Sequence, residues 1–215
     1  KEPIAYITGG KEFWKSYFVV NKDVLIPRPE TELIIEEMLK IIDKKSFKRL
    51  LEVGTGSGCI IISIMKERLN CRATAIDISK KAINIAKSNA KMHHLVNKIK
   101  FVNIDIDNIN LNKYDFIISN PPYISKSDLS RLDQSVRFYE PYIALEAGTD
   151  GLREIKKLII KSKELLKTNG KLIFEIGAGQ SVYTKQMLKN NGYYINKVIK
   201  DFSSIPRVII STKIN

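Results

Sequence analysis

The sequence is poor in the residues that form covalent cross-links and metal sites. Its 215 residues include two cysteines and two histidines. Cys59 and Cys71 have neither the number of a disulfide framework nor the spacing of a zinc site. His93 and His94 are neighbours at an expected helix end, without other metal ligands beside them. We therefore predict no metal site and a protein of the reducing cytoplasm.

Long apolar runs and paired catalytic motifs are also missing. No stretch approaches the roughly 20 apolar residues of a membrane helix, and the first ten residues lack the apolar segment of a signal peptide. No Ser-His-Asp arrangement or paired-carboxylate signature stands out. The length suits one α/β domain with a sizeable core, and we expect no contact with membranes.

Acidic residues are outnumbered by basic ones. The chain has 36 Lys and Arg against 23 Asp and Glu, which gives a formal net charge of +13. A basic surface favours polyanions such as nucleic acid, or a partner associated with the ribosome. The chain is also rich in Lys, Ile and Asn, so a compositional bias with solvated lysines explains the charge equally well.

The apolar pattern alternates between the two periods of strands and helices, which is typical of an α/β fold. Seven strands are expected, at residues 50–53, 73–76, 99–102, 116–119, 171–176, 193–199 and 208–211. Helices are expected at residues 30–44, directly after Gly58, and at 80–93, 151–166 and 182–189. Because no helix separates the last two strands, we predict antiparallel neighbours there. The predicted sheet is Rossmann-like, with seven mostly parallel strands and the last one reversed.

Two segments fall outside this alternation. Residues 1–29 contain β-prone runs at 4–7 and 17–20 around Gly9-Gly10, and we predict a hairpin and linker that pack on the main domain of residues 30–215. Residues 124–150 are mostly irregular but rich in aromatic side chains. Loops of this length in compact domains are usually functional or disordered, and the aromatic content favours a functional loop.

A glycine-rich loop follows the first predicted strand of the main sheet. Glycines at 54, 56 and 58 let the backbone turn tightly and let a ligand approach closely. The next strand ends at Asp77, where a carboxylate can accept the hydroxyls of a ribose. The dinucleotide fingerprint needs Gly or Ala where Cys59 stands, and the acid Glu52 suits a cationic ligand better than a pyrophosphate. The pattern favours a nucleoside cofactor such as S-adenosylmethionine.

A second motif, Asn120-Pro121-Pro122-Tyr123, follows the apolar strand at 116–119. Asn120 offers a side-chain acceptor, and the prolines leave backbone carbonyls with no N–H beside them. Two neighbouring acceptors can hold both hydrogens of a planar NH2 group, and Tyr123 offers a face on which that group can stack. We interpret the motif as a clamp for an amide or a nucleobase amine, although a plain Pro-rich turn remains the alternative.

Together these motifs resemble class I S-adenosylmethionine-dependent methyltransferases. More narrowly, the chain resembles the HemK/PrmC family, which methylates the side-chain amide of the glutamine in the Gly-Gly-Gln motif of peptide chain release factors. The narrower resemblance covers nearly the whole chain. Besides the glycine loop and the clamp, it is carried by residues 3–9 (PIAYITG) with Phe13-Trp14, 26–32 (IPRPETE) and 136–141 (VRFYEP).

The resemblance implies roles for individual residues. Those implied to bind S-adenosylmethionine are Glu52, Gly54, Thr55, Gly56, Ser57, Gly58, Asp77, Ile78, Asp105, Ile106 and Asn120. Those implied to bind the glutamine are Phe13, Arg28, Asn120, Pro121, Pro122 and Tyr123. Asn120, Pro121 and Tyr123 are implied to act in the transfer, which yields S-adenosylhomocysteine. The family often has an aromatic residue at the position of Ile106, so this sequence departs from it there.

The resemblance also implies a partner and leaves alternatives open. Release factors are the expected protein substrate, with a monomeric enzyme and only indirect contact with nucleic acid. The family's usual helical N-terminal domain is absent from this sequence, which leaves open that the chain is a fragment. The alternatives are an adenine-amine methyltransferase acting on DNA or RNA, a methyltransferase for a ribosomal-protein glutamine, and a binding module without catalysis.

Overall fold

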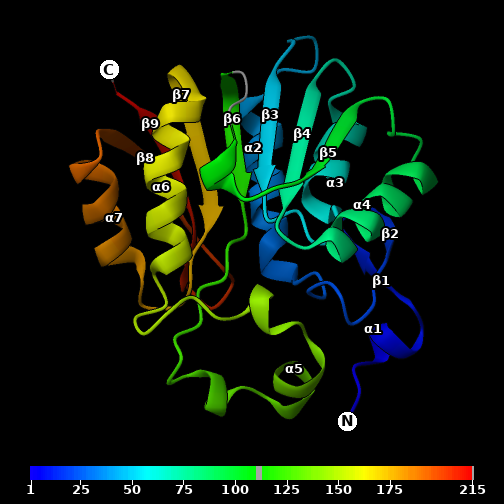
Figure 1. Cartoon of the computed structure of the whole chain (residues 1–215). Coiled ribbons are helices and arrows are strands. Elements are labelled where there is room, and N and C mark those ends of the chain that lie inside the picture. The colour runs from blue at the N-terminus through cyan, green and yellow to red at the C-terminus, as the bar shows by residue number, and fades with distance from the viewer. Residues whose placement is uncertain (110–112, 215) are drawn as a thin grey trace.

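A computed structural model describes residues 1–109 and 113–214 of the chain. Seven strands form one sheet in the order β5-β4-β3-β6-β7-β9-β8 (Figure 1). Each neighbouring pair is parallel except those made by β9, which runs antiparallel to both β7 and β8. This confirms the predicted sheet. The strands are β3 (Arg49–Val53), β4 (Arg72–Asp77), β5 (Ile99–Asn103), β6 (Tyr114–Ser119), β7 (Leu166–Glu175), β8 (Tyr193–Lys200) and β9 (Pro206–Lys213).

Helices cover both faces of the sheet because neighbouring strand residues point to opposite sides. Leu50 and Ile118 pack in one apolar cluster, and the adjacent Leu51 and Ile117 pack in the other. The first cluster includes side chains of α2 (Glu32–Ile41), α3 (Cys59–Glu67) and α4 (Lys80–Met92). The second includes side chains of α6 (Arg153–Leu165) and α7 (Ser181–Asn190). Among the described helices, none has both the length and the apolar composition needed to cross a membrane.

The N-terminal segment differs from the predicted hairpin. Ile4–Ile7 form the short helix α1, and the hairpin consists of β1 (Gly10–Phe13) and β2 (Ser16–Val19). The side chains of Ile4 and Ile7 are exposed, so their β propensity has no packed surface to act on. Gly9 follows the helix with φ +75, the conformation that commonly ends helices. The chain therefore turns at Trp14 and Lys15 instead of at the glycines.

The predicted helix at residues 30–44 is shorter than expected. A 3-10 turn, η1 (Pro29–Thr31), precedes α2, and Ile42 already has extended backbone angles. The irregular segment 124–150 contains the helix α5 (Gln134–Tyr139) between the turns η3 (Leu129–Arg131) and η4 (Tyr142–Ala144). Figure 1 shows this segment beyond the carboxyl ends of the parallel strands. It is therefore placed to cover a ligand at those ends.

Asn89 of α4 ties the hairpin to the glycine-rich loop. Its side chain is fully buried. Its Oδ1 accepts from the Val19 N–H at 2.8 Å, and its Nδ2 donates to the carbonyl oxygens of Val19 and Ser57 at 3.0 and 2.8 Å. One amide thus satisfies backbone groups of two segments that lie far apart in the sequence.

We expect Asn89→Ala to lower the free energy of unfolding by about 2–4 kcal/mol, because one buried and two partly buried backbone groups lose their partner. Urea unfolding followed by circular dichroism measures the change. Asn84→Ala is the matched control, because Asn84 lies on the same helix with an exposed side chain. Equal stability of the two variants would contradict the role assigned to Asn89.

Candidate active site

The carboxyl ends of β3, β4 and β6 lie side by side, because β3 pairs in parallel with both of the other strands. The glycine loop follows β3, Asp77 ends β4, and Asn120 follows β6. The backbone N–H groups of Gly54 and Thr55 donate to the Ile76 carbonyl oxygen at 2.9 and 3.0 Å, which holds the loop against β4. A hollow of about 500 Å³ opens at this point.

The glycine loop leaves room for a ligand. Gly54 and Gly56 have φ values of +70 and +54, and a Cβ atom added at either would meet no atom within 4 Å. Both line the hollow. Asp77 braces the loop, since its Oδ2 accepts from the Gly56 N–H at 2.9 Å and its Oδ1 accepts from the Ser79 N–H at 2.8 Å. Burial raises the pKa of Asp77, although these two hydrogen bonds oppose the shift.

Most residues predicted to bind the cofactor line this hollow. The structure brings together Gly54, Thr55, Gly56, Ser57, Asp77, Ile78, Asp105, Ile106 and Asn120. Glu52 and Gly58 lie outside the lining. Glu52 is buried beneath the loop and accepts a hydrogen bond from the Thr55 hydroxyl. A Cβ at Gly58 would lie 3.2 Å from Ala86 Cβ, so this glycine permits close packing against α4.

The clamp motif forms the boundary between two hollows. Asn120, Pro121 and Pro122 line the first hollow and also a second one of about 880 Å³. Tyr123 lines the second hollow only. A group held by Asn120 and the Pro121 carbonyl would therefore lie between the glycine loop, which lines the first hollow, and Tyr123, which lines the second.

A buried carboxylate lies beneath the clamp. Glu175, the last residue of β7, accepts hydrogen bonds from the Thr31 hydroxyl at 2.6 Å and from the Tyr123 hydroxyl at 3.3 Å. Asn120 Nδ2 donates to Thr31 Oγ1 at 3.1 Å. Burial raises the pKa of Glu175 to about 7, although the two hydroxyl groups oppose that shift.

Arg28 lines both hollows and comes from the segment before η1. Its guanidinium pairs with Glu140, whose side chain is buried and also accepts from the Ile26 N–H at 3.3 Å. The pair fastens residues 26–28 to the segment after α5. Phe13 does not join this group. It packs against Phe18 in the apolar core and is absent from the described linings of both hollows.

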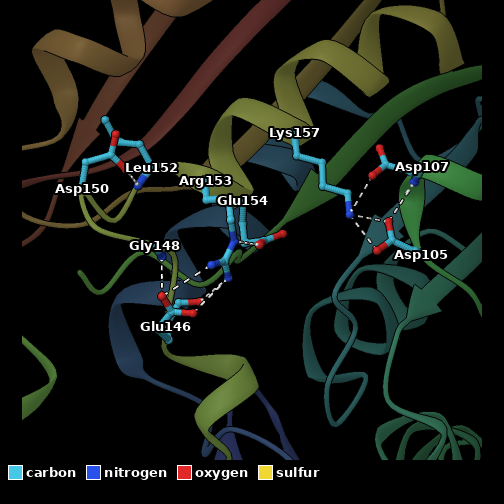
Figure 2. A network of polar contacts seen from close by, with 9 residues as sticks. All are labelled: Asp105, Asp107, Glu146, Gly148, Asp150, Leu152, Arg153, Glu154 and Lys157. Atoms are coloured by element: carbon cyan, nitrogen blue, oxygen red, sulfur yellow. Dashed lines mark hydrogen bonds and ion pairs between the residues drawn. The ribbon is translucent and has the colours of Figure 1, made fainter. Parts of the chain in front are cut away.

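Charged residues of α6 also line the first hollow. Figure 2 shows that Lys157 reaches toward Asp105 and Asp107, and that Arg153 reaches toward Glu146. Lys157 Nζ lies 2.6 Å from Asp105 Oδ1 and 2.9 Å from Asp107 Oδ2. Partial burial opposes ionisation of Asp105, but the Asp107 N–H and the Lys157 ammonium hold its pKa below the usual value. Arg153 Nη2 lies 3.1 Å from Glu146 Oε2, which attaches the segment after η4 to the same helix.

Sequence reasoning assigned no role to Thr31, Glu175, Glu140 or Lys157. Glu175 was detectable, since it is the one charged residue in the apolar run 172–176. Thr31 and Glu140 belong to motifs noted in the sequence, but their partners lie 144 and 112 residues away. Nothing in the sequence distinguishes Lys157 from other lysines, and only the fold shows that α6 places it beside Asp105. In the described residues, no group of three or more His, Cys, Asp and Glu could hold a metal ion.

Known proteins match both the sequence and the fold. A family model described as methyltransferase small domain matches residues 30–136. A release factor glutamine methyltransferase of Clostridium acetobutylicum is 37% identical over 216 residues, covering 99% of this chain and 76% of that protein. The chain belongs to the release factor glutamine methyltransferase family. A second family member, from Caulobacter vibrioides, is 35% identical over 214 residues and covers 99% of this chain and 74% of the relative.

Longer relatives match as well. A bifunctional methyltransferase of Rickettsia conorii is 40% identical in an alignment of 239 positions that covers 100% of this chain. The chain spans about half the length of this relative, 46%. Among solved structures, the hMettl16 catalytic domain superimposes with a TM-score of 0.70 at 19% identity, covering 92% of this chain and 75% of the other. At this identity the likeness establishes the class I methyltransferase fold alone.

Glu52 makes stability depend on pH in a way that a variant can isolate. Burial raises its pKa from 4.5 to about 8, against a weaker opposing effect of the Thr55 hydroxyl. Between pH 4.5 and about pH 8, Glu52 keeps a proton in the folded chain that it has lost in the unfolded chain. Stability therefore falls as pH rises through this window, by at most about 1.4 kcal/mol per pH unit.

We expect the free energy of unfolding of the wild type to fall more steeply from pH 5.5 to pH 8 than that of Glu52→Gln, measured by urea unfolding at each pH. Glu175 titrates in the same direction but is present in both proteins, so its contribution cancels. Parallel pH profiles of the two proteins would contradict the assigned pKa of Glu52.

Proposed function

We propose that the chain transfers a methyl group from S-adenosylmethionine to the side-chain amide nitrogen of the glutamine in the Gly-Gly-Gln motif of peptide chain release factors. The observation that carries the proposal is the position of Asn120 and Pro121 on the boundary between two hollows. A methyl donor in one hollow and a glutamine in the other would meet at this clamp. The names of the family members at 35% and 37% identity support the same reaction.

The first hollow offers the space and a hydrogen-bond acceptor that suit S-adenosylmethionine. The free space over Gly54 and Gly56 would accept the methionine and ribose portions, and Asp77 would accept the ribose hydroxyls. Asp77 Oδ1 and Oδ2 each accept one backbone N–H, which leaves further lone pairs on both oxygens for a ligand. Asp105 and Ile106 would lie at the adenine end. When bound, the cofactor supplies a methyl group attached to a sulfonium.

An amide nitrogen is a poor nucleophile because its lone pair is shared with the carbonyl group. The chain would therefore act mainly by positioning. Asn120 Oδ1 and the Pro121 carbonyl oxygen would each accept one N–H of the glutamine, which aims the nitrogen toward the first hollow. Oriented reactants can gain about 7–11 kcal/mol in the best cases. Both acceptors also favour the positive charge that develops on the nitrogen during transfer.

We also propose the organisation around this centre. Residues 1–29 form an accessory hairpin and linker, and residues 30–215 form the catalytic domain. The separate two-stranded sheet and the family match that begins at residue 30 support this division. We further propose a monomeric enzyme of the cytoplasm that acts on a release factor and contacts nucleic acid only indirectly.

The experiment for the function uses methyl-labelled S-adenosylmethionine with a release factor and, separately, with a structured RNA. Peptide mass spectrometry should place one methyl group on the glutamine of Gly-Gly-Gln. Asn120→Ala should lower turnover about 100-fold, because one acceptor for the reacting amide is lost, while cofactor affinity changes little. Asn84→Ala is the control.

Three outcomes of this experiment would count against the account. Label on adenine in the RNA would replace the proposed substrate with a nucleobase amine. Unmodified release factor with a cofactor-loaded enzyme would reject this chain as the glutamine methyltransferase. Equal losses of turnover and cofactor affinity in Asn120→Ala would contradict the role of Asn120.

Asp77→Asn should weaken cofactor binding by about 10- to 100-fold, because hydrogen bonds to a charged acceptor contribute about 1.5–3 kcal/mol. Isothermal titration calorimetry with S-adenosylhomocysteine measures the affinity directly. Asparagine keeps one of the two oxygens that accept the Gly56 and Ser79 N–H groups, so a melting temperature close to that of the wild type is the control for the shape of the loop. Unchanged affinity would remove Asp77 from the cofactor site.

A further inference from the structure

The clamp needs the oxygen of the Asn120 amide to face the reacting nitrogen. An asparagine side chain can place either its oxygen or its NH2 group at a given position, and the two orientations have nearly the same shape. If the NH2 group faced the glutamine amide, two donors would meet and the clamp would lose one acceptor. Some feature of the fold must therefore select the orientation.

Thr31 selects it through its single hydroxyl proton. A hydroxyl has one proton and two acceptor lone pairs. The Thr31 proton points at Glu175 Oε2, 2.6 Å away. The lone pairs of Thr31 Oγ1 are left to accept a hydrogen bond. Asn120 Nδ2, which lies 3.1 Å from Oγ1, donates it. Asn120 Oδ1 in that place would face a lone pair and be repelled.

The oxygen of Asn120 is consequently left for a ligand. Within residues 1–109 and 113–214, no hydrogen bond engages Asn120 Oδ1, while the residue lines both hollows. Glu175 also accepts from the Tyr123 hydroxyl at 3.3 Å. The buried Glu175 carboxylate thus holds Asn120 indirectly, through Thr31, and holds Tyr123 by a direct hydrogen bond.

We propose that Glu175, acting through Thr31, is a positioning residue that holds the Asn120 amide with Oδ1 toward the methyl-accepting nitrogen. This inference rests on the proposed methyl transfer for its consequence in turnover, but the amide orientation itself exists in the free protein. Thr31 and Glu175 touch neither reacting atom in this account. Their effect passes through the side chain of Asn120.

The protonation of Glu175 gives the arrangement a pH dependence. The groups that face this carboxyl are Thr31 and Glu30 from η1, Tyr123 from the segment after β6, and Arg207 from β9. Burial brings the pKa of Glu175 to about 7, the Arg207 charge lowers it and the Glu30 charge raises it. A protonated carboxyl can donate to Thr31 Oγ1, which frees the hydroxyl proton to face Asn120. Turnover should therefore fall as pH drops below about 7.

The main test compares Thr31→Val with Thr31→Ser. Valine has nearly the same shape without the hydroxyl, and serine keeps the hydroxyl. We expect Thr31→Val to lower kcat at least tenfold with a cofactor Kd within twofold of the wild type, and Thr31→Ser to recover most of the turnover. Thr184→Val is the matched control, because Thr184 is fully buried and its hydroxyl has no hydrogen-bond partner among the described residues.

Glu175→Gln provides a second test if Thr31→Val fails to fold. Its amide can turn either an oxygen or an NH2 group toward Thr31, so the orientation of Asn120 is no longer dictated. We expect at least a threefold loss of kcat. We also expect the pH profile of kcat in this variant to lack the decline below about pH 7. Wild-type turnover in Thr31→Val, or a wild-type pH profile in Glu175→Gln, would overturn the inference.

A measurement without catalysis separates this inference from the proposed function. In nitrogen-15-labelled protein, the side-chain NH2 resonances of Asn120 are identified by their loss in Asn120→Ala. Their hydrogen exchange should be slow in the wild type and Thr31→Ser and at least tenfold faster in Thr31→Val. If the wild type fails to methylate release factor, the proposed function fails, and this exchange difference still decides the inference. Equal exchange rates in the three proteins would overturn it.

Discussion

The parallel pairing of β3 with both β4 and β6 is the constraint on which the site depends. It places the carboxyl ends of three strands at one edge, so the glycine loop, Asp77 and Asn120 meet although they are distant in the sequence. The apolar pattern makes the pairing stable, because alternate residues of these strands are buried on both faces. Beyond β7, the strand that carries Glu175, the sheet continues with the reversed strand β9 and then with β8, which is antiparallel to β9.

Around this edge, charged side chains hold the polar groups in place. Glu175 holds Thr31 and Tyr123, Glu140 holds Arg28, and Lys157 joins Asp105 to α6. Each of these contacts links segments far apart in sequence, so each can exist only after the sheet has formed. An unpaired charge or polar group in such surroundings is costly, so these contacts favour one arrangement of the side chains around the clamp.

Local patterns in the sequence were sufficient for the sheet and for the positions of the glycine loop and of residues 120–123 at its edge, because their signals lie within a few residues of one another. Residues 50–77 show this, since an apolar run, the glycines, a helical pattern and a second apolar run predict a strand, a turn, a helix and a strand. Residues 4–7 show the limit: the run is β-prone, but its side chains are exposed and it forms a helix that ends before Gly9. Phe13 belongs to the apolar core, which spacing alone could not reveal. The contact between Thr31 and Glu175 could be found only from the three-dimensional structure, because no local pattern relates residues 144 positions apart.

The most direct test of the account is a crystal structure of the chain with S-adenosylhomocysteine and a peptide that contains Gly-Gly-Gln. The account predicts the cofactor product over Gly54 and Gly56 and the glutamine nitrogen within hydrogen-bond distance of both Asn120 Oδ1 and the Pro121 carbonyl oxygen. Thr31 should still lie between Asn120 and Glu175. A glutamine bound away from this clamp, or an Asn120 amide that turns its NH2 group toward the glutamine, would contradict the account.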